Sequence, residues 1–269
     1  MTDEHPGATH LCERLLKKWD PMFFETVDPT RAKRTGAMLE ALGSHFGGRF
    51  RVLELGSGPG SLTLRMLRRF PRCTIVAVDT DPVLLQVGKV SLYRFGRRVS
   101  WTLTDIRARQ WFSTLPVGRF DVVVSSLTLH WLEADEIRHL YRNLGRLLRA
   151  GGLLVNGDFL PAVGPPRRIG GRTAASESHR TTERRETDLQ SFKVNWANWW
   201  RTVEREPSMQ TSLRERQVRL PGPIPPRRAT GPKIPVSLEH HEKMLRDAGF
   251  VETRVVWQED GFRVLVGAR

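Results

Sequence analysis

The sequence predicts a doubly wound α/β fold with a mostly parallel sheet, and two observations carry that prediction. From residue 51 onward, short apolar runs alternate with amphipathic helical patterns, which is the order that successive βαβ units produce. A glycine cluster at residues 56–60 stands directly between the first apolar run and the first helical pattern. Such a turn lets the backbone approach a ligand closely at the start of a helix.

The elements follow in order along the chain. Amphipathic helices are expected at 11–24 and 30–42, because apolar residues recur there at intervals of three and four. Five strands are expected next, with helices between them, and Gly151-Gly152 should end the helix before the fifth strand. A helix over 237–248 and a two-stranded hairpin joined at Asp260-Gly261 should complete the sheet. The predicted strands are 51–55, 74–78, 100–104, 120–124, 153–159, 252–258 and 262–268.

The length and composition fit one core with an insertion. The chain has 269 residues, 39% of them hydrophobic, which is short for two full domains. We expect N-terminal cap helices over 1–48, a ligand-binding core over 49–160, a basic and partly flexible lid insertion over 161–236, and a C-terminal helix and strand pair over 237–269. Within the insertion, 161–186 and 221–235 have the composition of connectors, whereas 189–203 has the pattern of a helix with an aromatic face.

The cellular setting follows from what the sequence lacks. The first ten residues do not have the pattern of a signal peptide, and no stretch has the length and apolarity of a membrane span. Cys12 and Cys73 lack metal-ligand spacing, so we expect buried thiols and no metal site. A soluble, cytoplasmic protein is predicted, and its oligomeric state stays open.

Three acidic residues stand at the ends of three successive strands. Glu54, Asp79 and Asp105 would lie at the edge where open α/β sheets bind ligands. Taken singly, each has a structural alternative: a salt bridge, a helix cap or a turn. A dinucleotide fingerprint would need a third glycine where Ser61 stands, which disfavours an NAD-dependent oxidoreductase.

The order of these motifs resembles that of class I S-adenosylmethionine-dependent methyltransferases. The resemblance rests on Val52–Gly60, Val76–Asp79, Thr104-Asp105 and Phe120–Ser125, and it covers roughly residues 51–159 together with the closing strand pair. It implies a seven-stranded Rossmann-like sheet with an antiparallel last strand, and S-adenosylmethionine as the cofactor. It also implies that Glu54 and the glycines hold the methionyl part, Asp79 the ribose, and Asp105 with Ile106 the adenine. The full set of predicted cofactor-binding residues is Glu54, Gly56, Ser57, Gly58, Gly60, Asp79, Thr80, Asp105, Ile106 and Ser125.

Residues 129–131, Leu-His-Trp, are similar to the corresponding stretch of small-molecule carboxyl methyltransferases. His130 is the candidate catalytic base or hydrogen-bond partner of the acceptor oxygen, and the alternative is that this stretch simply packs the loop against the next helix. Aromatic residues from three parts of the chain are the candidate walls of an apolar acceptor pocket, with core packing as the alternative. They are Trp19, Phe24, Trp131, Trp196, Trp199 and Trp200.

The predicted function is methyl transfer to a small-molecule acceptor at a carboxylate or hydroxyl oxygen, as in secondary metabolism. The net charge of +14 motivates the alternative of an RNA or DNA methyltransferase. However, residues 161–235 hold fifteen basic and seven acidic residues, so more than half of the excess lies in the insertion. The stretch after the fourth strand, Ser125-Ser126-Leu127, also differs from the proline-aromatic motif typical of base-amino methylation. A protein that binds the cofactor for other chemistry is the remaining alternative.

Overall fold

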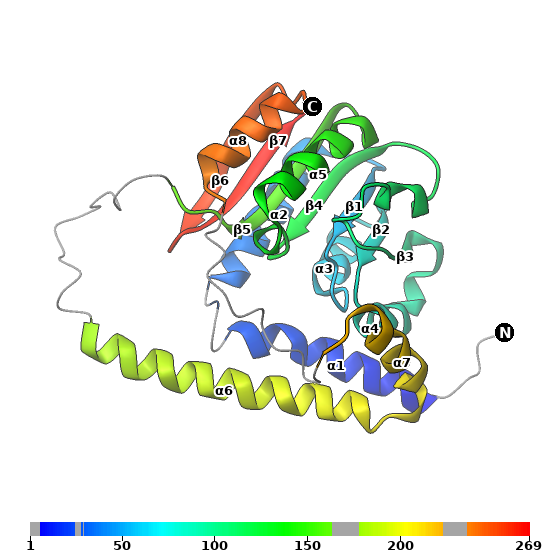
Figure 1. The fold of residues 1–269 in the computed structure, drawn as a ribbon. Helices are drawn as coiled ribbons and strands as arrows, with labels where there is room; N and C mark the ends of the chain where they lie inside the picture. The colour runs from blue at the N-terminus through cyan, green and yellow to red at the C-terminus, as the bar shows by residue number, and fades with distance from the viewer. Residues whose placement is uncertain (1–5, 25–27, 29, 163–177, 223–235) are drawn as a thin grey trace.

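The strands form a single sheet that confirms the predicted fold class. The structure, a computed structural model, describes residues 6–24, 28, 30–162, 178–222 and 236–269. Within these residues the sheet has seven strands in the order β3-β2-β1-β4-β5-β7-β6 (Figure 1). The pairs from β3 to β5 are parallel, and β7 is antiparallel to both of its neighbours. The strands are β1 (Arg51–Leu55), β2 (Thr74–Asp79), β3 (Val99–Leu103), β4 (Phe120–Ser126), β5 (Leu148–Phe159), β6 (Glu252–Glu259) and β7 (Phe262–Ala268).

Helices cover both faces of the sheet (Figure 1). One face packs against α5 (Ala134–Leu147) and α8 (Leu238–Asp247). The other packs against α2 (Arg31–His45), α3 (Ser61–Arg69) and α4 (Pro82–Ser91). The strand sequence runs outward from β1 to β3 and then returns to β4 on the other side of β1. This reversal opens a crevice at the carboxyl ends of β1 and β4, which is where such sheets bind ligands.

An outer layer lies across the carboxyl ends of the strands. It is made by α1 (Pro6–Phe24), α6 (Ser178–Glu204) and α7 (Gln210–Arg219), with α1 and α6 side by side (Figure 1). The indole N–H of Trp199 in α6 donates to the backbone carbonyl of Leu15 in α1 at 3.0 Å. Short 3-10 turns, η1 (Tyr93–Arg98), η2 (Trp111–Thr114), η3 (Leu129–Trp131) and η4 (Pro207–Met209), connect the main elements.

Several local predictions are confirmed. Asp81 caps α4, because its carboxylate accepts from the backbone N–H of Val83 at 2.9 Å. Asp260 and Gly261 both have positive φ, at 49° and 82°, as a two-residue hairpin turn requires. Cys12 and Cys73 are buried free thiols.

Two local predictions are wrong, and one helix was not predicted. The helix expected to run to Gly151 ends at Leu147, because the chain turns extended at Leu148 and that residue pairs with Phe120 of β4. Helix α6 begins at Ser178, inside the segment whose composition predicted a connector. Helix α7 had no sequence prediction at all, since its apolar face consists of little more than Leu213 and the stem of Arg216.

Candidate functional site

The glycine loop forms a cradle at the carboxyl end of β1. Gly56, Gly58 and Gly60 have φ values of 66°, 54° and 88°, a region that side chains other than glycine rarely adopt. A β-carbon on Gly56 would lie 2.1 Å from the hydroxyl of Thr128. The loop is anchored to β2, because the backbone N–H of Ser57 donates to the carbonyl of Val78 at 3.0 Å. The positive φ values of the loop and the close approach of Thr128 therefore both explain why glycine is needed here.

Glu54, which is buried, and Asp79, which is partly buried, place two carboxyl groups beside this cradle. Glu54 accepts from the Thr63 hydroxyl at 2.5 Å, and Asp79 accepts from the backbone N–H of Gly58 at 2.8 Å. Burial raises the pKa of Glu54 to about 8, and the charge of Asp79 adds to that rise. Burial also raises the pKa of Asp79, to about 6. In the described part of the chain neither carboxyl group has a cationic partner, so the pair is suited to a ligand that carries positive charge.

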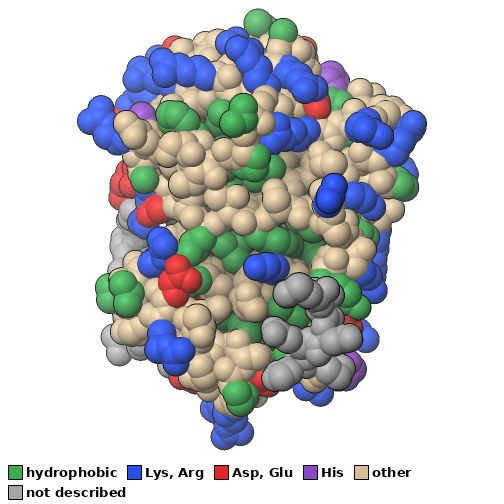
Figure 2. Space-filling view, turned by 90° about the vertical axis from the view of Figure 1, so that its right-hand side faces the viewer, with side chains coloured by type: hydrophobic (Ala, Val, Ile, Leu, Met, Phe, Trp, Pro, Cys, Tyr) green, Lys and Arg blue, Asp and Glu red, His purple; other side chains and the backbone are tan. Residues whose placement is uncertain are grey.

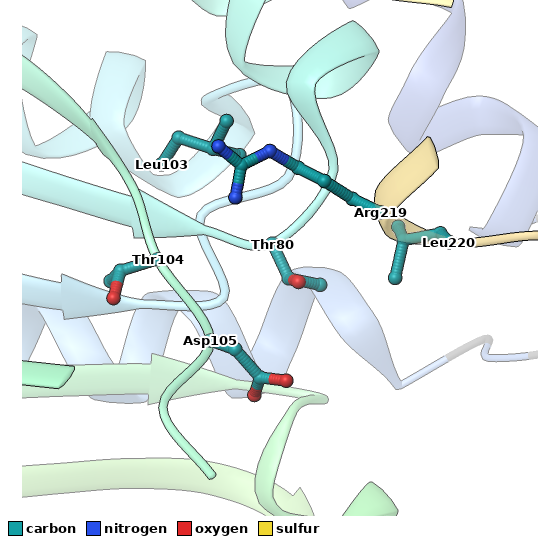
Figure 3. A pocket seen from close by; sticks show the side chains of 6 residues that line it. All are labelled: Thr80, Leu103, Thr104, Asp105, Arg219 and Leu220. Atoms are coloured by element: carbon teal, nitrogen blue, oxygen red, sulfur yellow. The ribbon is translucent and has the colours of Figure 1, made fainter. Parts of the chain in front are cut away.

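Asp105 lines a cavity of about 160 Å³ beside the ends of β2 and β3. Its carboxylate is paired with Arg107 at 2.7 Å, and that pairing lowers the pKa of Asp105. Thr80 lines the same cavity, and Figure 3 shows both side chains at this space. On the opposite side lie Arg219 and Leu220, from the end of α7.

The remaining predicted cofactor residues occupy different surroundings. Ser57 is buried within the loop, and Ser125 is buried in β4 with its hydroxyl 3.4 Å from the carbonyl of Leu55. The side chain of Ile106 packs into the core between the sheet and α5. The structure thus brings Glu54, the glycine loop, Asp79, Thr80 and Asp105 to one edge of the sheet, whereas Ser125 and Ile106 lie beneath that edge.

His130 is held by a buried carboxylate. Its Nδ1 lies 2.7 Å from Oδ1 of Asp158, which is on β5, and its backbone N–H donates to Oδ2 at 3.1 Å. Asp158 is fully buried, and although burial alone would raise its pKa, the His130 contacts lower it. The His130 side chain itself is 24% exposed. A carboxylate at Nδ1 fixes the ring orientation and leaves Nε2 free to accept a proton.

The predicted pocket aromatics separate into two groups. Trp19 packs on the glycine loop, since a β-carbon at Gly58 would lie 3.7 Å from its ring. Trp19 also contacts Trp196 and Trp199, with ring centroids 5.8 and 5.3 Å away. Trp200 is fully buried behind them.

Trp131 stands apart from this cluster. It is 42% exposed and packs beside His130. Phe24 ends α1, and its side chain lies outside the described residues.

Three residues that position the site escaped the sequence analysis. Asp20 joins α1 to the first turn of α3, accepting from the Ser61 hydroxyl at 2.5 Å and from Arg31 at 2.9 Å. Trp101 lies against Gly60, where a β-carbon would come within 2.7 Å of its ring. Asp158 had a detectable signal, because it is a charged residue near the end of an apolar strand, as Glu54 is. Asp20 and Trp101 had none, since their partners are distant in the sequence.

On the face shown in Figure 2, the Lys and Arg side chains of the described residues lie at many separate places. Two arginines are internal: Arg34 pairs with Asp28 at 2.6 Å, and Arg216 pairs with Asp81 at 2.8 Å. This face therefore presents no single basic stripe of the kind that follows a nucleic-acid backbone.

Comparison with known proteins assigns the core of the chain. Residues 52–152 match the family model described as a methyltransferase domain. Residues 52–152 belong to the class I S-adenosylmethionine-dependent methyltransferases. The methyltransferase domain thus runs from β1 into β5 and contains the glycine loop, the three strand-end acids and His130, and its cofactor is S-adenosylmethionine.

Curated relatives match over this same domain. A malonyl-[acyl-carrier protein] O-methyltransferase from Paenibacillus sp. (strain JDR-2) is 32% identical over 113 residues, covering 41% of this chain and 39% of that protein. A trans-aconitate 2-methyltransferase from Azoarcus sp. (strain BH72) is 32% identical over 103 residues, covering 38% of this chain and 36% of that protein. The chain therefore spans less than two fifths of the length of these relatives.

Solved structures support the fold over a longer stretch. An O-methyltransferase family protein from Burkholderia thailandensis superposes with a TM-score of 0.53 at 16% identity, covering 89% of this chain and 56% of that one. A putative O-methyltransferase from Nostoc punctiforme gives a TM-score of 0.53 at 16% identity, covering 100% of this chain and 62% of that one. At these identities the likeness establishes the fold.

The residues present fit the cofactor of this family. A sulfonium and an ammonium group both carry positive charge, and the buried Glu54 and the partly buried Asp79 have no cationic partner among the described residues. The glycine loop admits close backbone approach, and the cavity at Thr80 and Asp105 continues the site along the carboxyl ends of the strands.

In the described residues, every helix is too short or too polar to span a membrane, and no group of acidic, histidine and cysteine side chains is placed to hold a metal ion.

Proposed function

We propose that this chain transfers a methyl group from S-adenosylmethionine to an oxygen atom of a small-molecule acceptor. The observation that carries the proposal is that the two acids at the glycine loop, Glu54 and Asp79, have no cationic partner among the described residues, while the His130–Asp158 pair lies at the neighbouring strand ends. Two relatives are named as methyltransferases of malonyl-[acyl-carrier protein] and of trans-aconitate. These names support a small acceptor group that carries oxygen.

Each part of the cofactor has candidate partners. Glu54 and the loop glycines would hold the methionyl part, Asp79 the ribose, and Asp105 with Thr80 the adenosine end. Ser57 within the loop and Ser125 beneath it would help to hold the loop in place. When bound, the cofactor supplies an electrophilic methyl group on a sulfonium. Trp19 covers the loop from α1 and excludes water from the reacting atoms.

His130 is proposed to act on the acceptor oxygen. With Nδ1 directed at the Asp158 carboxylate, Nε2 accepts the proton of a hydroxyl acceptor as the methyl group arrives. A carboxylate acceptor is already ionised near neutral pH, so toward it His130 would serve only as a hydrogen-bond donor or packing partner. Trp131 and the aromatic residues of α6 are the proposed walls of the acceptor pocket.

Titration with S-adenosylhomocysteine, followed by calorimetry, tests the cofactor assignment. Saturable binding is expected for the wild type and is expected to be lost in Asp79→Ala. Asp135→Ala is the matched control, because that side chain is 91% exposed at the start of α5. Absence of binding by the wild type would contradict the proposal, and binding unaffected by Asp79→Ala would contradict the role of that residue.

Asp158→Asn separates the two acceptor classes. The substitution keeps the side-chain shape but favours the His130 tautomer that carries its proton on Nε2. For a hydroxyl acceptor, kcat should fall by roughly 10² to 10⁴, whereas methylation of a carboxylate should change little. Unchanged affinity for S-adenosylhomocysteine would show that the variant is folded. Equal losses for both acceptor classes would argue against His130 as a base.

A separate measurement addresses the nucleic-acid alternative. Binding of RNA by the protein at moderate salt would favour that alternative.

A further inference from the structure

The end of α7 meets the methyltransferase domain at its cofactor cavity. Helix α7 lies outside residues 52–152, the part that matches the family model. Even so, Arg219 and Leu220 line the cavity of about 160 Å³ that Thr80 and Asp105 line from the strand ends. Figure 3 shows Leu220 next to Thr80 and the Arg219 side chain extending toward Leu103.

A buried ion pair fixes α7 in this position. Nε of Arg216 lies 2.8 Å from Oδ2 of Asp81, and both side chains are nearly inaccessible to solvent. The other carboxylate oxygen of Asp81 caps α4, which starts three residues after Asp79 on β2. The guanidinium of Arg216 also packs over the Trp200 ring, 5.0 Å from its centroid. The insertion is therefore joined to the strand end that carries the proposed ribose ligand.

The chemistry of the cavity matches a flat, largely apolar group with a polar edge. Leu103, Leu220 and the aliphatic stem of Arg219 supply apolar surface, while Thr80 and the Asp105 carboxylate supply hydrogen-bonding groups on the strand side. A guanidinium plane stacks favourably on aromatic rings. Arg219 is paired only with Glu215 of its own helix among the described residues, at 3.0 Å and in an exposed position, so it is available to a ligand at little cost.

We propose that Leu220 and Arg219 form the outer wall of the adenosine end of the cofactor site, with Leu220 and the plane of the Arg219 guanidinium packing against the ring. This inference rests on the proposed function. It assigns cofactor-binding residues to the insertion, which the sequence motifs of the family do not include. In the same insertion, α6 contacts Trp19 over the glycine loop. The insertion would then contact the cofactor site both at the glycine loop and at the adenosine end.

Two ligands and two matched pairs of variants test the proposal. Dissociation constants are measured for S-adenosylhomocysteine and for 5′-methylthioadenosine, which keeps the adenosine and sulfur but lacks the amino-acid part. Leu220→Ala is compared with Val218→Ala, because Val218 is 82% exposed on the same helix. Arg219→Ala is compared with Arg214→Ala, another exposed arginine of α7. Thermal melting without ligand reports whether each variant is folded.

Leu220→Ala is expected to weaken both ligands by about tenfold and by the same factor, because lost apolar contact at the adenosine affects both equally. Arg219→Ala should weaken both by a smaller common factor, and the two control variants should bind as the wild type does. Should Leu220→Ala not fold, Arg219→Ala decides, since its side chain is exposed.

Three results would overturn the proposal. A loss confined to S-adenosylhomocysteine would place the effect at the methionyl end. Unchanged affinities in both cavity variants would remove α7 from the site while leaving the proposed function intact. Failure of the wild type to bind either compound would remove the proposed function and this inference together.

Discussion

Glu54 is expected to destabilise the ligand-free protein near neutral pH, and replacing it with glutamine tests this. The residue is 2% exposed, and burial raises the pKa of its carboxyl group from 4.5 to about 8. The unfolded chain releases this proton near pH 4.5, whereas the folded chain keeps it until about pH 8. Between these values folding takes up a proton, so the free energy of unfolding falls as the pH rises.

The size of the effect follows from the shift. For one group the free energy of unfolding falls by about 1.4 kcal/mol per pH unit across that window. At pH 7 the accumulated loss is about 3 kcal/mol. Glutamine still offers an oxygen to the Thr63 hydroxyl but has no charge to bury. Glu54→Gln should therefore raise the free energy of unfolding at pH 7 by about 3 kcal/mol and the melting temperature by roughly 6–12 °C.

Urea unfolding from pH 5 to 9 measures this difference. The gain of Glu54→Gln over the wild type should grow with pH and level off above pH 8. Glu40→Gln is the matched control, because Glu40 is exposed on α2, and it should change stability little at any pH. A gain for Glu54→Gln that is the same at pH 5 and pH 8 would refute the reasoning, because it would show that the carboxyl group has an ordinary pKa in the folded protein.

The same carboxyl group should make cofactor binding depend on pH. The ammonium group of S-adenosylhomocysteine favours the ionised form of Glu54, so binding of this ligand at pH 7 should release protons. Calorimetry in two buffers of different ionisation enthalpy measures that release. Glu54→Gln should bind the ligand more weakly and with less proton release, and equal release by both proteins would assign the effect to another group.

The remaining predictions concern the packing of helices α2 and α4 and the contact between α5 and α8. Gly88→Ala should destabilise the protein by about 1–3 kcal/mol, because the new β-carbon would lie 2.5 Å from the Trp101 ring; Gly36→Ala, with nothing within 4 Å in α2, should instead stabilise it by up to about 1 kcal/mol. Urea midpoints decide both, and a stabilising Gly88→Ala would contradict the contact. Tyr141→Phe should cost about 1–3 kcal/mol by leaving the buried His241 ring, 2.7 Å from the Tyr141 hydroxyl, without that partner. Burial lowers the pKa of His241 to about 4 from 6.5, so the unfolded chain takes up the proton first and stability should fall as the pH drops below 6.5; His241→Asn should lose less stability over that range.

The sheet was predictable because its signals are local. Alternating apolar runs and helical patterns depend on neighbours within a few residues, and so do the Asp81 cap and the Asp260-Gly261 turn. The helix α7 was not predictable in this way. Its position depends on the pairing of Arg216 with Asp81, 135 positions away in the sequence.

The candidate site likewise combines features that local sequence patterns predict with contacts between residues that are distant in the sequence. Local sequence patterns were enough to predict the doubly wound fold, the glycine loop and the three strand-end acids, because the carboxyl ends of parallel strands always lie on the same side of a sheet. Tertiary packing alone shows that Asp158 holds His130, that Asp20 and Trp101 support the loop, and that the end of α7 reaches the cavity lined by Thr80 and Asp105. Each of these contacts joins residues whose separation in the chain carries no periodic signal, so they exist only once the chain has packed.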